Sequence, residues 1–316
     1  MVKLASYVLL AMAVLLGVGV ATSWAPDRSV EQLSERWATP PSTFVEVDGM
    51  QVHIRDQGPH NEALPLVLIH GTSASLHTWD DWTTQLSTDR RVVRFDLPAF
   101  GLTGPAPDSD YTIERYADFV VKILDLSGIE RAVLAGNSLG GQIAMETALQ
   151  TPERVAGLVL VDAAGYPFEA ESMPLGFRLA QIPAFAPLMN RILPRSIIAS
   201  SVRNVYGDPS LVSEELIDRY YELTLRAGNR QALPQRFKQM TFRDDMRQRA
   251  STLSMPTLII WGENDRLLPP ILGVQMHEDI AASELVMIAG AGHVPHEEVP
   301  QETLLVLDKF LADHQL

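Results

Sequence analysis

The chain has 316 residues, 46% of them hydrophobic and 20% charged, so it can bury a sizeable core and is not a disordered protein. Its 25 basic and 39 acidic residues give a formal net charge of −14. This argues against a nucleic-acid partner, because such binding depends on Lys and Arg side chains that neutralise phosphates. The absence of cysteine excludes disulfides, thiolate catalysis, iron–sulfur clusters and zinc sites with cysteine ligands. The length suits one large α/β domain with an insertion.

An apolar segment occupies the N-terminus. Leu4–Ala21 has no charged residue and follows Lys3. It is close to the minimum of about 17 residues for a spanning helix and longer than the roughly 7–15 of a signal-peptide core. We therefore expect residues 1–25 to be a membrane anchor, with a cleaved signal peptide as the alternative, and residues 26–43 to be a polar linker. In both cases Lys3 stays inside, which places the rest of the chain on the extracytoplasmic side, either membrane-anchored or secreted.

The remaining chain alternates short apolar runs with helical patterns. A hairpin is expected first, because Phe44–Val47 and Val52–Arg55 alternate around Asp48-Gly49. Six further runs are mainly apolar, as in strands buried on both faces of a parallel sheet: Leu66–Ile69, Val92–Phe95, Ala132–Ala135, Leu158–Val161, Leu258–Trp261 and Leu285–Ile288. Helices are expected at 112–126, 139–150, 269–279 and 299–313. This order indicates an α/β fold with a doubly wound, mostly parallel sheet.

This rhythm breaks between about residues 166 and 250. The segment is helical in pattern and rich in Pro and Met, and it separates the run ending near Asp162 from the run starting at Thr257. We expect a core of residues 44–165 and 251–316, with residues 166–250 as a helical insertion over one end of the sheet. Because doubly wound sheets bind ligands at the carboxyl ends of their strands, the residues after each run are the functional candidates.

A nucleophile is predicted after the run Ala132–Ala135. Gly136-Asn137-Ser138-Leu139-Gly140 has the pattern G-x-S-x-G, placed between a strand and a helix. The turn in such a motif is too tight for side chains at its flanking positions, which explains Gly136 and Gly140. Ser138 is then held in a strained backbone with its hydroxyl exposed at the start of a helix.

A serine hydroxyl needs a base, and the base needs a carboxylate to orient it. His293 follows the last apolar run, in a glycine-containing loop, and is the predicted base, with His296 as its rival. Asp265 follows Leu258–Trp261 and is the predicted carboxylate, with Asp162 as its rival.

Acyl transfer also requires donors for the developing oxyanion. The backbone amide of Leu139 is one candidate, since it directly follows the nucleophile. The amide of Thr72 is the other, in the loop His70-Gly71-Thr72 after the run Leu66–Ile69. Here Gly71 lets the loop approach closely, and His70 is expected to be structural.

These residues make the sequence similar to the α/β-hydrolase fold superfamily from about Phe44 to the C-terminus. The landmarks that match are His70-Gly71, Asp96–Gly101, Gly136–Gly141, Asp265 and Gly292-His293, although Ala99 stands where glycine is common. The resemblance implies an eight-stranded sheet and a Ser–His–Asp hydrolase with a helical cap. Serine at position 138 disfavours haloalkane dehalogenases and epoxide hydrolases, which carry aspartate there.

Within that superfamily, the sequence also resembles two particular groups of proteins. The run Gly-Asn-Ser-x-Gly-Gly also resembles carbon–carbon bond hydrolases of the meta-cleavage type, although these often have an aromatic residue where this chain has Val294. The N-terminal anchor with this core resembles membrane-bound monoacylglycerol lipases.

We expect a serine hydrolase of carboxylic esters, lipid-like esters among them, because an apolar, Met-containing lid over such a site suits an acyl chain. The alternatives are a carbon–carbon bond hydrolase and a non-catalytic binding protein of the same fold. A small-molecule or lipid-like ester is the expected partner, together with the membrane through the N-terminal segment. No metal or organic cofactor is expected, because the chain has no HExxH, Walker or dinucleotide-binding motif.

Overall fold

The computed structural model of the protein describes residues 7, 19, 21–61, 63–182 and 190–316. Of the predicted anchor, residues 1–25, the structure describes only Tyr7, Gly19 and residues 21–25, and the rest lies outside the described part of the chain. Within the described ranges, no helix combines the length and the hydropathy needed to cross a bilayer.

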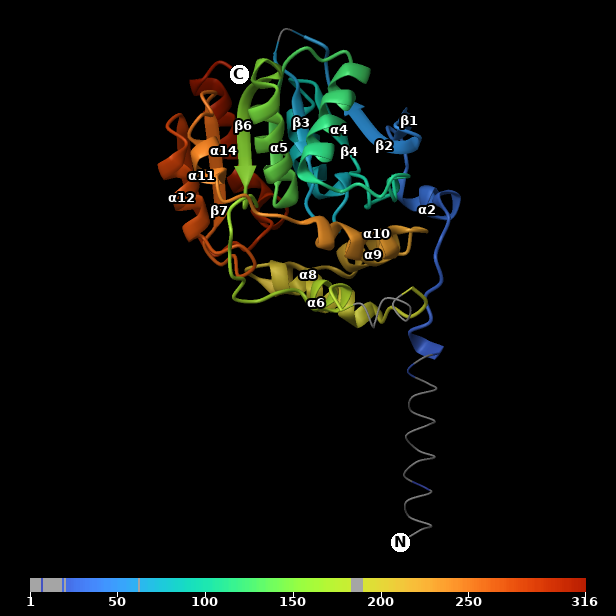
Figure 1. The fold of residues 1–316 in the computed structure, drawn as a ribbon. Coiled ribbons are helices and arrows are strands. Elements are labelled where there is room, and N and C mark those ends of the chain that lie inside the picture. Colours follow the sequence, from blue (N-terminus) through green and yellow to red (C-terminus); the bar gives the residue numbers. More distant parts are fainter. Residues whose placement is uncertain (1–6, 8–18, 20, 62, 183–189) are drawn as a thin grey trace.

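Eight strands form one sheet in the order β1-β2-β4-β3-β5-β6-β7-β8 (Figure 1). They are β1 (Thr43–Val47), β2 (Met50–Gln57), β3 (Leu66–Ile69), β4 (Val92–Phe95), β5 (Ala132–Asn137), β6 (Val155–Val161), β7 (Thr257–Gly262) and β8 (Ser283–Ile288). Strand β2 pairs antiparallel with β1 and with β4, whereas all other neighbours are parallel. The predicted doubly wound, mostly parallel sheet is confirmed.

The hairpin between β1 and β2 turns at Asp48 and Gly49. Both have positive φ, 52° and 78°, as expected for a two-residue turn that follows the twist of its strands.

Helices cover both faces of the sheet. One face carries α4 (Ile113–Leu126), α5 (Leu139–Gln150) and α12 (Ile271–Asp279), and the other carries α3 (Asp80–Leu86) and α14 (Pro300–Asp313). In β3, Val67 and Ile69 belong to the first core, while Leu66 and Leu68 belong to the second. Burial of both faces is why the predicted runs are continuously apolar rather than alternating. Shorter helices are η1 (Leu76–Trp79), η2 (Pro152–Arg154) and α13 (Pro295–Glu298).

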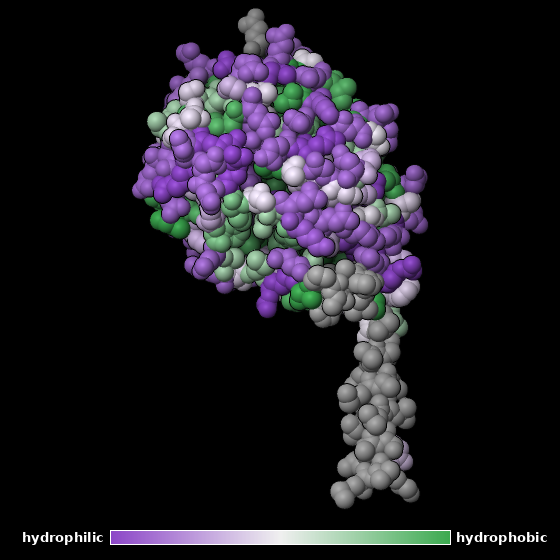
Figure 2. All heavy atoms as spheres, in the orientation of Figure 1, coloured by the Kyte–Doolittle hydropathy of each residue, from purple (hydrophilic) through white to green (hydrophobic). Residues whose placement is uncertain are grey.

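A helical segment lies between β6 and β7. It contains α6 (Leu175–Ala180), α8 (Arg195–Val205), η4 (Pro209–Leu211), α9 (Glu214–Thr224), α10 (Asn229–Gln239) and α11 (Met246–Ala250). Figure 1 shows α6, α8, α9 and α10 as a layer below the carboxyl end of β6; these four are called the cap helices below. Helix α11 instead contacts α5 and α12 of the core. In Figure 2 the visible surface is mostly hydrophilic, and hydrophobic residues form separate groups on it, one of them on the cap side.

The segment 26–43, expected to be a polar linker, is a packed part of the domain instead. It contains α2 (Val30–Trp37), whose Leu33 and Trp37 lie one turn apart and are buried. Trp37 Nε1 donates a hydrogen bond of 2.7 Å to Glu222 of α9. Two apolar side chains at i and i+4 give this short helix one face that can be buried. Because its other residues are mostly polar, the composition of the segment does not indicate this face.

Candidate active site

Ser138 lies on a sharp turn between β5 and α5. Its backbone is strained, with φ 56° and ψ −118°. A Cβ added to Gly136 would lie 2.2 Å from the carbonyl carbon of Gly140, and one added to Gly140 would lie 2.1 Å from the carbonyl oxygen of Ile69. Only glycine fits at these two positions, so the turn has the shape that the G-x-S-x-G pattern predicts.

Asp265 and His293 are hydrogen-bonded in the loops after β7 and β8. His293 Nδ1 lies 2.7 Å from Asp265 Oδ2, and both side chains are buried. The other oxygen, Oδ1, accepts hydrogen bonds from the amides of Leu267 (2.8 Å) and Leu268 (3.0 Å), which fix the carboxylate. Because Nδ1 donates to this carboxylate, Nε2 is left as the acceptor of a proton.

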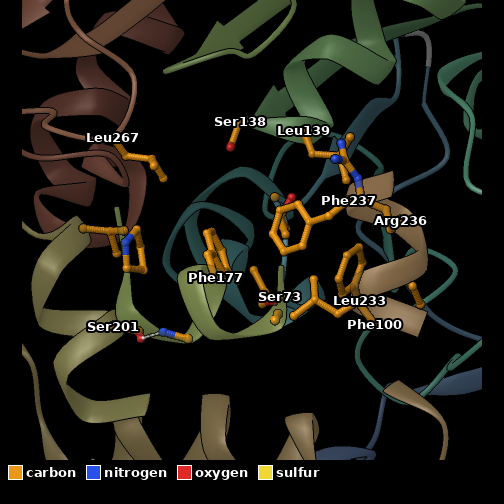
Figure 3. A pocket seen from close by; sticks show the side chains of 18 of the residues that line it. Ser73, Phe100, Ser138, Leu139, Phe177, Ser201, Leu233, Arg236, Phe237 and Leu267 are labelled. Carbon is orange, nitrogen blue, oxygen red and sulfur yellow. Dashed lines mark hydrogen bonds between the residues drawn. The ribbon is translucent and has the colours of Figure 1, made fainter. Parts of the chain in front are cut away.

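Ser138 and His293 line the same cavity, of about 220 Å³. Thr72 and Leu139 line it as well. Figure 3 shows the Ser138 hydroxyl directed toward the cavity, with Leu139 next to it. The structure thus brings four of the five predicted site residues to one cavity, and Asp265 reaches it through His293.

His296, the alternative candidate for the base, is packed among other side chains instead. It is fully buried, its Nε2 is 3.0 Å from Thr78 Oγ1, and its ring centroid is 4.0 Å from that of Trp79. Burial lowers the pKa of His296 well below its ordinary value. We therefore assign His296 a packing role.

The rival carboxylate, Asp162, lies close to the Asp265–His293 pair. Its Oδ1 accepts a 3.0 Å hydrogen bond from the Gly262 amide, and its Oδ2 has no donor among the described residues. Burial raises the pKa of Asp162 well above its ordinary value, and the nearby Asp265 carboxylate raises it further. Asp162 therefore keeps its proton to higher pH than an ordinary aspartic acid.

Asp162, Asp265 and His293 are also the only group in the described ranges whose donor atoms converge as a metal site would, within 4.8 Å of one another. The hydrogen bond between Asp265 and His293 already uses two of these donor atoms, so an ion would have to break it to bind there. The cluster fits a hydrogen-bonded acid–base group better than a metal centre.

Three backbone amides at the cavity are free to donate. Those of Thr72, Ser73 and Leu139 form no hydrogen bond with any other described residue. The turn is closed by the Ala74 amide, which donates to the Gly71 carbonyl at 3.2 Å, and Ser73 has a positive φ of 60°. Ser73 is thus a second candidate for the donor assigned to Thr72, and no sequence signal indicated it.

His70 holds this loop in place. Its Nδ1 donates to the carbonyl oxygen of Gly71 at 2.8 Å, and its Nε2 accepts from the Leu97 amide at 2.9 Å. Burial lowers the pKa of His70, which favours the neutral ring that this pattern requires. Both ring nitrogens are occupied, in agreement with the structural role expected for this residue.

Two residues that the sequence analysis did not single out support the site. Asn137 Nδ2 donates to the carbonyl oxygens of Val161 (3.1 Å) and His293 (3.0 Å), joining the Ser138 turn to the histidine loop. Glu298 accepts from the amides of Gly292 (2.8 Å) and of Gly207 in the cap segment (3.0 Å). Asn137 stands inside the motif and could have been suspected, whereas nothing in the pair Glu297-Glu298 shows which of the two binds the histidine loop.

The cap side of the cavity is mainly apolar. Phe177 of α6 and Phe237 of α10 meet edge to face, with ring centroids 5.4 Å apart, and both line the cavity (Figure 3). Phe168 and Phe242 form a similar lining pair at 5.5 Å. These four rings give the cap side of the cavity an apolar wall.

Comparisons with known proteins agree on one family. The family model for the alpha/beta hydrolase fold matches residues 65–300. The chain is 30% identical to a 2-hydroxymuconate semialdehyde hydrolase from Pseudomonas sp. strain CF600, over 84% of this chain and 92% of that protein. Among solved structures it is similar to a thermophilic esterase from Thermogutta terrifontis (25% identity, TM-score 0.71, covering 87% and 98% of the two chains). It is also similar to a membrane phospholipase A described as a bacterial virulence factor (25% identity, TM-score 0.73, covering 100% and 99%).

Proposed function

The chain belongs to the α/β-hydrolase fold family, and on this premise we propose that it is a serine hydrolase that cleaves carboxylic esters through an acyl-enzyme. One arrangement carries the proposal. Ser138 stands on a strained turn at the cavity, and His293, which lines the same cavity, has Nδ1 bound to Asp265 and Nε2 left as the base. This is the arrangement that activates a serine hydroxyl.

The proposed reaction uses these groups in two steps. Ser138 Oγ attacks the ester carbonyl carbon while His293 Nε2 takes the hydroxyl proton, and Asp265 stabilises the imidazolium. The amides of Leu139 and Thr72 donate hydrogen bonds to the oxyanion, and His293 returns the proton to the departing alcohol. Water then attacks the acyl carbon as the same nitrogen takes its proton, and His293 returns this proton to Ser138 Oγ as the acid leaves.

Ester cleavage is favoured by the aromatic and aliphatic lining of the cavity, which suits an acyl chain and includes lipid-like esters in the proposed substrate class. The similarity to an esterase and to a phospholipase A supports it. Carbon–carbon bond hydrolysis is the second candidate, favoured by the 30% identity to the 2-hydroxymuconate semialdehyde hydrolase.

A substrate comparison separates the two candidates. We expect the purified protein to turn over p-nitrophenyl esters of graded acyl length, with kcat/KM at least about tenfold above that for a meta-cleavage dienone acid. A fluorophosphonate probe should label Ser138 in either case, and failure to label would favour the non-catalytic binding protein. A higher kcat/KM for the dienone acid would replace ester cleavage by carbon–carbon cleavage.

We also propose that the N-terminal segment anchors the protein, with the catalytic domain on the extracytoplasmic side. The start of the domain is tied to the cap segment. The Leu193 amide donates to the Ser23 carbonyl at 2.9 Å, and the Arg28 amide donates to the Leu225 carbonyl at 2.7 Å. An anchor that ends there would hold the cap and its cavity near the membrane surface, where lipid-like esters are found.

We expect the full chain to remain with membranes after a carbonate wash and a variant comprising residues 22–316 to be soluble and active, because it keeps these hydrogen bonds. A mature protein that begins near residue 22 would indicate a cleaved signal peptide instead. Protection of the domain from protease in spheroplasts would place it in the cytoplasm.

A further inference from the structure

Arg236 is a buried cation that lacks a partner among the described residues. It lies on α10, is 5% exposed, and forms no hydrogen bond or ion pair with any other described residue. The other buried arginine of this helix, Arg230, is paired with Asp27 at 2.5 Å. Burial lowers the pKa of Arg236, but a guanidinium remains protonated at neutral pH. An unpaired buried charge is strongly destabilising, so its presence requires an explanation.

The Arg236 side chain faces the reaction site. It lines the catalytic cavity and also a small adjoining pocket that it shares with Leu139 and Gln142 of α5. Figure 3 shows its nitrogens close to Leu139, the residue that follows Ser138. The charge therefore lies near the turn that presents the nucleophile.

No negative charge compensates Arg236 inside the cavity. The described lining residues of both pockets include Arg230 and Arg236 but no Asp or Glu, although the whole chain has a net charge of −14. Tyr116, which lines the small pocket with Arg236, donates its hydroxyl proton to the Pro98 carbonyl at 2.9 Å. The cavity thus combines an apolar wall with one cation that lacks a counter-ion.

We propose that Arg236 binds a carboxylate group of the substrate, so that the preferred esters carry a second, anionic end. This inference rests on the proposed function and narrows its substrate class. A guanidinium presents parallel N–H donors that match the two oxygens of a carboxylate, and exclusion of water by the apolar wall strengthens the pair. An anionic substrate supplies the counter-ion that the free cavity lacks.

The test uses mono-p-nitrophenyl esters of dicarboxylic acids with four to eight carbons, each compared with its neutral methyl-capped counterpart. For the best chain length, we expect the wild type to prefer the acid at least about tenfold in kcat/KM, as for a charged hydrogen-bonded pair. Arg236→Met should abolish this preference, measured as the ratio of kcat/KM for each acid to kcat/KM for its methyl-capped counterpart. Arg243→Met, which removes an exposed arginine beside Asp245, should leave the preference intact.

Thermal unfolding separates binding from a structural role. If Arg236 is unpaired in the free protein, Arg236→Met should keep or raise Tm, and a marked fall would overturn the inference. Equal rates for acids and neutral esters in the wild type would also overturn it, while leaving ester hydrolysis in place. If no ester is cleaved at all, the proposed function of ester hydrolysis is wrong. Stabilisation by suberate of the wild type but not of Arg236→Met would then still support the carboxylate site, and equal Tm shifts would overturn it.

Discussion

Ser138→Ala is expected to lower kcat by about 10⁴–10⁶ and to abolish fluorophosphonate labelling, as removal of a nucleophile does in other serine hydrolases. The fold should be kept, because the Ser138 side chain makes no capping hydrogen bond to α5 and an alanine Cβ occupies the same strained position. The measurements are kcat on the best p-nitrophenyl ester and the Tm of both proteins.

Ser201→Ala is the matched control for this loss. Ser201 also faces the cavity, but its hydroxyl accepts from the Gly176 amide at 3.0 Å and donates to the Ile197 carbonyl at 2.8 Å (Figure 3). We expect this variant to keep kcat within about tenfold. If Ser138→Ala also stayed within tenfold of the wild type, Ser138 would not be the nucleophile.

Asp265→Asn is expected to lower kcat by about 10⁴, by analogy with the same change in other triads. The amides of Leu267 and Leu268 donate to Oδ1, so they would hold the oxygen of the new amide and turn its NH₂ toward His293 Nδ1. His293 would then have to accept at Nδ1 and carry its proton on Nε2, where it cannot act as a base. Steady-state kinetics together with the imidazole proton shifts in NMR would measure both effects.

Asp162→Asn is the paired variant. It replaces a carboxyl group that already tends to stay protonated, and its side-chain oxygen can still accept from the Gly262 amide. We expect a loss in kcat of less than about tenfold. A large loss for Asp162→Asn with a small one for Asp265→Asn would make Asp162 the carboxylate that orients the base.

The order of the elements and the positions of the candidate site residues follow from local patterns in the sequence. Strands buried on both faces are mainly apolar, so each of the six predicted apolar runs lies within a strand of the sheet. The turn at Ser138 was also readable, because the requirement for Gly136 and Gly140 comes from close backbone approach and not from distant side chains.

Which of these side chains contact one another depends on how the loops pack in the folded domain. Asp162 and Asp265 both follow parallel strands that are neighbours in the sheet, and only the packing of the loops shows that Asp265 faces His293 Nδ1. The burial of α2 against α9 and the unpaired charge of Arg236 were equally invisible, because both depend on contacts between segments far apart in the sequence. Local patterns reflect the backbone and the buried faces of single elements, whereas pairing and its absence are properties of the assembled fold.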